Sequence, residues 1–160
     1  MIQFLYVMFD WGDTIMKDDR SMNMPMYKWP KVEVIEGAED TLKILHKESK
    51  IFMATGATES NESDIRSALK RVKINNYFDR IYCVKNTGYR KPSEEFYRYV
   101  LKDQNITPSE IVMIGDNFDG DILGANKVGI EGIWLNMESN EVKEGNLFRT
   151  IFSLRELLTI

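Results

Sequence analysis

Short, almost wholly apolar runs recur along the chain, and segments with a helical spacing of apolar residues separate them. Five such runs are predicted to be strands, at residues 3–9, 51–54, 81–84, 111–114 and 133–135. Apolar runs without polar alternation are typical of strands buried on both faces, as in parallel sheets. Their alternation with helices favours a single α/β domain over residues 1–160, built on a mainly parallel five-stranded sheet.

Helical spacing predicts helices at residues 37–49, 62–72, from about 92 onward, 121–127 and 153–158. Residues 16–36 are expected to be irregular. Their first part, residues 16–30, is rich in methionine and also contains Tyr27 and Trp29; we call it the Met-rich loop. Two interpretations of this loop remain open. Its flexible apolar side chains either form an adaptable contact surface or fold back onto the core.

Composition excludes several classes of function. The formal net charge of −4 gives no overall attraction to nucleic acid or anionic membrane, and the basic residues between 66 and 73 fit the solvent face of a helix. Cys83 is the only cysteine and His46 the only histidine, so a disulfide within the chain and multi-cysteine or multi-histidine zinc sites are excluded. Without a signal sequence or a long apolar span, we expect a cytoplasmic protein that does not enter a membrane.

Polar side chains follow three of the predicted strands at the point where each strand ends. They are Asp10, Thr55 and Asp116, and the loop after the third strand adds Lys91. Because the carboxyl ends of parallel strands meet at one edge of a sheet, these four residues are expected to converge. Two carboxylates, a hydroxyl and an ammonium suit a divalent cation such as Mg²⁺ together with a phosphoryl group.

Four motifs surround these residues in the order Asp10-Trp11-Gly12-Asp13-Thr14, Thr55-Gly56, Gly88-Tyr89-Arg90-Lys91-Pro92 and Gly115-Asp116-Asn117-Phe118-Asp119-Gly120-Asp121. In this set the chain resembles the haloacid dehalogenase (HAD) superfamily of hydrolases. Members of that superfamily carry Asp-x-Asp-Gly-Thr after the first strand, Thr or Ser after the second, a loop Lys, and Gly-Asp-x-x-x-x-Asp after the fourth. The resemblance covers residue 3 to the end and implies a three-layer Rossmann-like fold, with helices on both faces of the sheet.

The resemblance implies a Mg²⁺-dependent phosphatase in which Asp10 attacks phosphorus and forms an aspartyl-phosphate that water then hydrolyses. It implies that Asp10, the backbone carbonyl of Gly12 and Asp116 hold Mg²⁺, which neutralises charge between nucleophile and substrate. Asp121 is expected to lie beyond the direct ligands or to reach the metal through water. An N-cap of the following helix is an equally good interpretation of Asp121.

The remaining site residues are also assigned by resemblance. Lys91 is expected to stabilise both the phosphoryl charge and Asp10. Thr55, with backbone amides near Trp11 and Gly56, is expected to bind the phosphate.

One position departs from the superfamily pattern. The second aspartate of the first motif, which serves as general acid and base, is replaced here by Gly12. Asp13 is expected to take the turn position that glycine normally holds, because aspartate tolerates unusual backbone angles, and not to replace the missing acid directly. General acid–base catalysis contributes about 10²–10⁴-fold, so weak turnover of alkyl phosphates is expected, with better rates for good leaving groups.

Size is the second departure, because many relatives insert a cap domain at one of two places. Here residues 16–36 are too few for a helical cap, and residues 56–90 are filled by one predicted helix and one predicted strand. The site is therefore expected to be capless, and either open or covered by a neighbouring subunit. The expected partner is a phosphorylated substrate, small or macromolecular. A homo-oligomer formed through the Met-rich loop is a further expectation.

Three other classes of function compete with a phosphatase. A non-catalytic or regulatory module that binds phosphate or protein stays open, as does a phosphonate-cleaving or phosphotransfer enzyme of the same superfamily. A phosphoacceptor receiver domain also uses Asp, Thr, Lys and Mg²⁺. That class carries its acidic pair after the first strand and its acceptor after the third, and the order found here excludes it.

Overall fold

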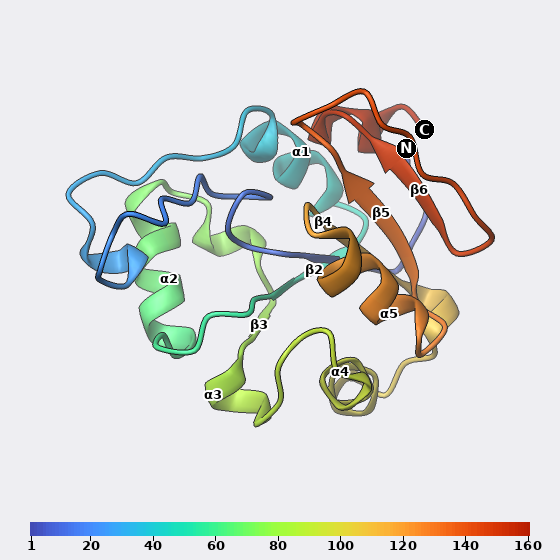
Figure 1. The fold of residues 1–160 in the computed structure, drawn as a ribbon, viewed down its shortest axis with the longest axis horizontal. Helices are drawn as coiled ribbons and strands as arrows, with labels where there is room; N and C mark the ends of the chain where they lie inside the picture. Colours follow the sequence, from blue (N-terminus) through green and yellow to red (C-terminus); the bar gives the residue numbers. More distant parts are fainter.

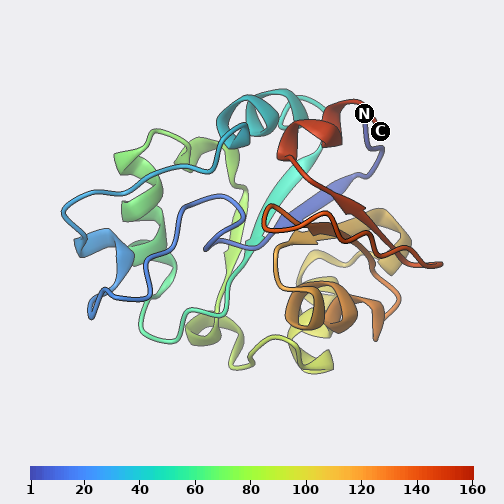
Figure 2. The same ribbon diagram turned by 45° about the horizontal axis from the view of Figure 1, so that its top comes forward.

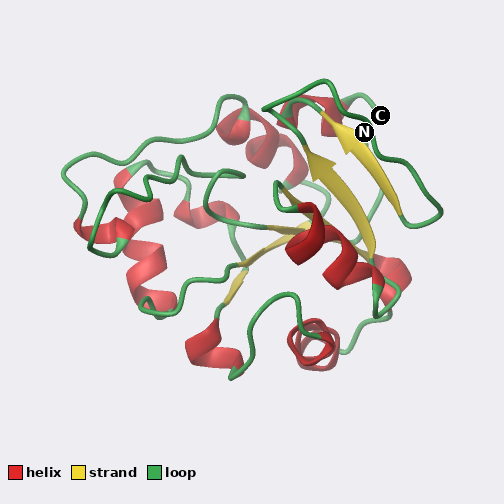
Figure 3. Ribbon diagram, in the orientation of Figure 1, coloured by secondary structure: helices red, strands yellow, loops and turns green.

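All six strands of the computed structural model, which describes residues 1–160, run parallel in a single sheet (Figures 1 and 3). The strands are β1 (Tyr6–Phe9), β2 (Lys50–Ala54), β3 (Arg80–Tyr82), β4 (Ile111–Gly115), β5 (Glu131–Leu135) and β6 (Phe148–Ile151). Their order across the sheet is β3-β2-β1-β4-β5-β6. The predicted α/β fold with a parallel sheet is confirmed.

The sheet has one strand more than the five predicted. β6 lies at the edge beside β5, and only Ile151 of its four residues is fully buried. A half-exposed edge strand needs no continuous apolar run, and Arg149 interrupts this one. The signal that identified the central strands is therefore weak at β6.

The register of the central strands places the candidate site. Phe9 at the end of β1 pairs with Met53 of β2 on one side and with Ile114 of β4 on the other. The three strands therefore end at nearly the same level. The residues that follow them, Asp10 among them, emerge together at the carboxyl edge of the sheet.

Helices cover both faces of the sheet (Figure 2). They are α1 (Ala38–Leu45), α2 (Glu62–Arg71), α3 (Val84–Thr87), α4 (Glu94–Gln104), α5 (Gly124–Asn126), the 3-10 turns η1 (Met26–Lys28), η2 (Asn75–Tyr77), η3 (Pro108–Glu110) and η5 (Leu154–Leu158), and the π-helix η4 (Phe118–Leu123). None of these helices is both long enough and apolar enough to span a lipid bilayer.

Successive residues of β1 pack into opposite layers, as the pleat of a strand requires. Val7 and Phe9 join the larger core cluster with α1 and α2, whereas Met8 joins the smaller cluster with α4 and α5. All three side chains are fully buried. The three-layer arrangement of helix, sheet and helix is therefore the observed one.

Two boundaries differ from the sequence prediction. The third strand, predicted over 81–84, ends at Tyr82, and Val84 begins α3. The side chain of Asn86 explains the early end, because it accepts from the amide of Cys83 at 2.9 Å and donates to the carbonyl of Ile81 at 2.7 Å. Cys83 is fully buried just after the strand.

The predicted terminal helices are also shorter or differently wound. Residues 153–158 form only the 3-10 turn η5, and the helix predicted over 121–127 starts earlier as η4 and passes into α5. The side chain of Asn117 accepts from the amide of Gly120 at 2.9 Å and starts η4. The N-cap is thus Asn117, and the N-cap interpretation of Asp121 is wrong.

The Met-rich loop folds back onto the protein along much of its length. Met16, Met26 and Trp29 are buried, whereas Met24 is 45% exposed. The guanidinium of Arg71 in α2 donates to the carbonyl of Trp29 at 2.6 Å and holds the loop against that helix. Between β1 and α1 the only helix is the three-residue turn η1.

Candidate active site

A buried ammonium group lies at the centre of the site. Nζ of Lys91 donates to Oδ1 of Asp10 at 2.7 Å, to Oδ1 of Asp121 at 2.8 Å and to the carbonyl of Ala54 at 2.6 Å. Only 7% of the Lys91 side chain is exposed, against 13% for Asp10 and 2% for Asp121. All three N–H donors of the ammonium are therefore used, and its position is fixed by three separate segments of the chain.

Electrostatics keep this lysine charged despite its burial. Burial alone favours the neutral amine, but the negative charges of Asp10 and Asp121 outweigh it and raise the pKa of Lys91 above its ordinary value. Asp10 consequently keeps a permanent cation beside one of its two oxygens.

The hydroxyl of Thr14 links the carboxylates that follow β1 and β4. Oγ1 of Thr14 lies 3.4 Å from Oδ2 of Asp10 and 3.2 Å from Oδ1 of Asp116, and it accepts from the amide of Asp116 at 3.2 Å. Thr14 is fully buried. The sequence predicts no specific role for Thr14, although its place in the first motif is a signal that could have identified it.

The two later aspartates are held in their carboxylic-acid form more strongly than ordinary ones. Burial, together with the hydrogen bond and charge of Asp10, raises the pKa of Asp116 to about 8. Burial also raises the pKa of Asp121 to about 6, with Lys91 opposing the shift and Asp10 adding to it. Negative charge is crowded at this edge of the sheet.

This crowding fits a divalent cation. Asp10, Asp116 and Asp121 each offer a carboxylate oxygen, and these oxygens lie within 4.8 Å of one another. When all three carboxylates are ionised, their charges and that of the Lys91 ammonium sum to −2, which one divalent cation neutralises. Carboxylate oxygens are hard donors of the kind that Mg²⁺ takes, so the donor set matches that ion.

Two aromatic side chains support the acidic segment from behind. The hydroxyl of Tyr97 in α4 donates to the carbonyl of Gly120 at 2.9 Å, and the indole N–H of Trp134 in β5 donates to the carbonyl of Asp116 at 2.8 Å. Both residues are buried. Trp134 lies in a predicted strand and Tyr97 in a predicted helix, and the sequence predicts no contact of either residue with the site.

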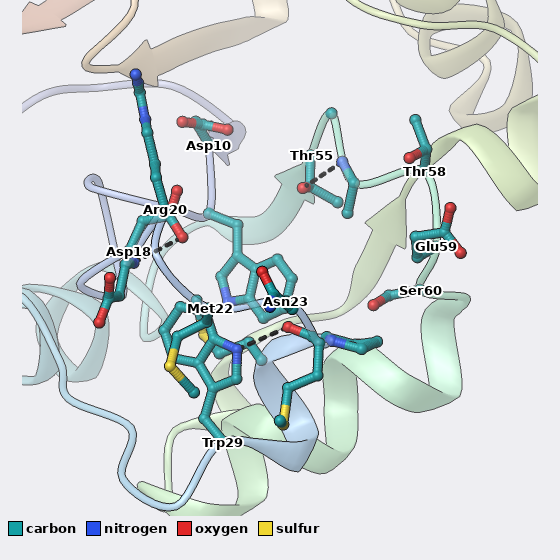
Figure 4. Close-up of a pocket in the computed structure, with 18 residues that line it drawn as sticks. Asp10, Asp18, Arg20, Met22, Asn23, Trp29, Thr55, Thr58, Glu59 and Ser60 are labelled. Carbon is teal, nitrogen blue, oxygen red and sulfur yellow. Dashed lines mark hydrogen bonds between the residues drawn. The ribbon is translucent and has the colours of Figure 1, made fainter.

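A cavity of about 730 Å³ opens in front of Asp10 (Figure 4). Of the sequence-predicted site residues, those that line it are Asp10, Trp11, Gly12, Thr55 and Gly56. The other three, Lys91, Asp116 and Asp121, do not line the cavity and are joined to it through Asp10. In Figure 4, Asp10 and Thr55 lie at one end of the cavity and Trp29 at the other, which the Met-rich loop supplies.

The turn after Asp10 has the expected backbone. Asp13 has a φ of 59°, in the left-handed region that aspartate tolerates better than most residues. Its Oδ1 accepts from the amide of Asp18 at 3.1 Å, and Asp13 does not line the cavity. The side chain of Asp13 therefore organises the following loop and does not occupy the place left free by Gly12.

The substitution Gly115→Ala tests how tightly the Asp121 carboxylate is held in the site. A Cβ at position 115 would overlap the carboxylate of Asp121, so Gly115→Ala must displace that carboxylate from Lys91. We expect a loss of about 1–3 kcal/mol in the free energy of unfolding, as in other overpacked sites, measured by urea denaturation. Gly56→Ala is the matched control, because its added methyl group meets no atom within 4 Å. Equal stability of both variants would contradict this reading of the site.

The chain matches a family model and is similar to several known enzymes. The family model described as haloacid dehalogenase-like hydrolase matches residues 9–135. A glyceraldehyde 3-phosphate phosphatase of Pyrococcus furiosus is 29% identical over 107 residues, which are 67% of this chain and 44% of the relative. The pyrimidine 5'-nucleotidase YjjG of Escherichia coli is 30% identical over 125 residues, which are 77% of this chain and 54% of the relative. The chain thus spans about half the length of these curated relatives.

A solved structure resembles the whole chain. An uncharacterized protein from Listeria monocytogenes serotype 4b superposes with a TM-score of 0.81 at 25% sequence identity, covering 97% of this chain and 99% of that one. The family match extends from the end of β1 to the end of β5 and includes all four motifs. The chain belongs to the haloacid dehalogenase-like hydrolase family.

Proposed function

We propose that the chain is a Mg²⁺-dependent phosphomonoester hydrolase that works through an aspartyl-phosphate on Asp10, in a single domain over residues 1–160. One observation carries the proposal. The Asp10 carboxylate faces a cavity on one side and is bonded to the buried ammonium of Lys91 on the other. A carboxylate that is paired with an ammonium group and faces a cavity is placed for nucleophilic attack.

The chemistry divides into two displacements at phosphorus. An oxygen of Asp10 forms a bond to phosphorus while the bond to the ester oxygen breaks, and water then displaces Asp10 and releases inorganic phosphate. Lys91 holds the Asp10 carboxylate in position throughout. Thr55 and the backbone amides near Trp11 and Gly56 bind the phosphoryl oxygens, and all three residues line the cavity.

The metal is assigned to the crowded carboxylates. Asp10, Asp116 and the backbone carbonyl of Gly12 are the proposed ligands of Mg²⁺, with Asp121 beside them and bonded to Lys91. When bound, the ion neutralises charge between the nucleophile and the anionic substrate.

Small phosphate monoesters are the proposed substrates. The two curated relatives are named for glyceraldehyde 3-phosphate and for pyrimidine 5'-nucleotides, both of which carry a phosphate on a small organic group. The cavity of about 730 Å³ is of a size that accommodates such molecules.

Phosphate release from a panel of phosphomonoesters tests the function. We expect turnover with Mg²⁺, none after EDTA treatment, and recovery when Mg²⁺ is restored. Asp116→Asn is expected to raise the Mg²⁺ concentration for half-maximal rate at least about 10-fold, since even residues that only support a metal ligand change affinity this much. A full rate in EDTA would contradict the metal assignment.

A second candidate function is a module that binds phosphate or a partner protein without turnover. Gly12 favours it, because no side chain at that position can transfer a proton. Phosphonate cleavage and phosphoryl transfer at the same site are alternative enzymatic functions. Calorimetric binding of inorganic phosphate in the absence of any turnover would support the module over the enzyme.

We also propose self-association through the Met-rich loop, where Met24 is 45% exposed beside the cavity. An apolar side chain at the mouth of a site without a cap domain is suited to a contact with a second copy. Light scattering checks this, and a strict monomer at all concentrations would contradict it.

A further inference from the structure

The proposed reaction needs a group that transfers protons, and none of the residues described so far has that role. Expelling an alkoxide requires a proton, and activating water requires a base. The carboxylates that line the cavity are those of Asp10, Asp18, Asp19 and Glu59. Asp10 is the nucleophile, so one of the other three must supply this role if a side chain supplies it at all.

Asp19 and Glu59 are poorly placed for it. The carboxylate of Asp19 accepts from both the hydroxyl and the amide of Ser21, and these hydrogen bonds lower the pKa of Asp19. A carboxyl group with a lowered pKa takes up and holds a proton less readily, so Asp19 is a poor general acid and base. Glu59 lies across the cavity from Asp18 in Figure 4, on the segment that follows Thr55.

Asp18 lies beside the gap that Gly12 leaves. A Cβ built on Gly12 would stand 3.3 Å from Cβ of Asp18 and 3.5 Å from its Oδ2. Oδ1 of Asp18 accepts from the amide of Asp19 at 2.9 Å, whereas Oδ2 makes no hydrogen bond within the protein. One carboxylate oxygen is thus free, next to the space that a side chain at position 12 would fill.

The backbone of Asp18 is held in place by the turn after the nucleophile. Its amide donates to Oδ1 of Asp13 at 3.1 Å, and Asp13 takes the left-handed conformation that directs its side chain toward this loop. Asp13 is thereby a positioning residue. Asp13, which stands one place later than the second aspartate of the superfamily motif, thus anchors the backbone that carries the Asp18 carboxylate at the cavity.

We propose that Asp18 is the general acid and base of this site, an inference that rests on the proposed phosphatase activity. In the first step the bond between phosphorus and the ester oxygen breaks as Asp10 bonds to phosphorus, and the departing oxygen takes the proton of the Asp18 carboxyl. In the second step water gives a proton to the Asp18 carboxylate as its oxygen bonds to phosphorus. The bond to Asp10 breaks and the Asp10 carboxylate is restored.

Asp18→Asn is expected to separate the two steps. With p-nitrophenyl phosphate, whose leaving group needs no proton, the variant should release a burst of p-nitrophenol equal to the enzyme concentration and then turn over slowly. With an alkyl phosphate it should show no burst, and turnover should fall by about 10²–10³-fold. If Asp18 served only folding or loop packing, the variant would lower the turnover of both substrates to a similar degree and would show no burst.

Two further variants complete the test. Asp19→Asn is the matched control, an adjacent cavity carboxylate, and should stay within a few-fold of the wild type on both substrates. Gly12→Asp combined with Asp18→Asn returns a carboxylate to the neighbouring position and should recover alkyl phosphate turnover. If Asp18→Asn behaves like Asp19→Asn in an enzyme that Asp10→Asn inactivates, the assignment of Asp18 is overturned while the phosphatase function stands. If the wild type turns over neither substrate, both fail.

Discussion

Asp10→Asn is expected to lower kcat for every phosphomonoester by about 10⁴-fold or more, the scale seen when a catalytic nucleophile is removed. Asparagine keeps the size of the side chain and can still accept from Thr14, but its amide oxygen is too weak a nucleophile to form a stable acyl-phosphate. Steady-state kinetics with Mg²⁺ at saturation measures the loss. Circular dichroism and urea denaturation show whether the variant remains folded.

Contamination by another phosphatase is the main confounder, so the same preparation is compared before and after a second purification step. Thr55→Ser offers a conservative control within the same cavity, because it keeps the hydroxyl that accepts from the amide of Ala57 at 3.1 Å. It should retain most of the activity. Activity of Asp10→Asn within 10-fold of the wild type would contradict the covalent mechanism.

Lys91→Met is expected to lower the free energy of unfolding by about 3–5 kcal/mol, the cost of breaking a buried ion pair by removing one partner. The reason lies in the contacts, because the ammonium is the common partner of Asp10, Asp121 and the carbonyl of Ala54. Without it, the two largely buried carboxylates of Asp10 and Asp121 are left close together with no counter-charge. Urea denaturation of the metal-free protein measures the change.

A double-mutant cycle isolates the electrostatic part of that loss. Asp121→Asn removes one of the two carboxylates that Lys91 neutralises, so the double variant with Lys91→Met should be less destabilised than the sum of the single changes. Lys85→Met, on the short helix α3, is the matched control and should change stability by less than about 0.5 kcal/mol. Strict additivity of the two site changes would contradict a coupled buried cluster.

The central part of the fold is predictable from the sequence for a clear physical reason. β1, β2 and β4 are buried on both faces, so their residues form continuous apolar runs that end where a polar residue begins. Parallel pairing then requires that Asp10, Thr55 and Asp116 meet at one edge. The convergence of site residues follows from the same pattern that predicts the fold.

The features that escaped prediction depend on tertiary contacts that leave no local pattern. β6 is half exposed, and α3 begins where the side chain of Asn86 captures the backbone after β3. The hydrogen bonds of Tyr97 and Trp134 to the acidic segment depend on how a helix and a strand pack against that segment. Asp18 reaches the cavity only through the path of an irregular loop, and its distance from Asp10 along the chain follows no motif.

The central claim is that the reaction proceeds in two displacements through Asp10. Stereochemistry at phosphorus tests this claim more directly than any binding or mutational result. Each in-line displacement inverts the phosphorus, so two displacements through Asp10 give net retention of configuration. An ester of thiophosphate made chiral with one heavy oxygen isotope, turned over by the wild-type enzyme in water that carries the other heavy isotope, gives chiral inorganic thiophosphate. The configuration of that product reports the outcome whether or not the intermediate accumulates. We expect net retention. Net inversion would show direct attack by water and would contradict an aspartyl-phosphate on Asp10.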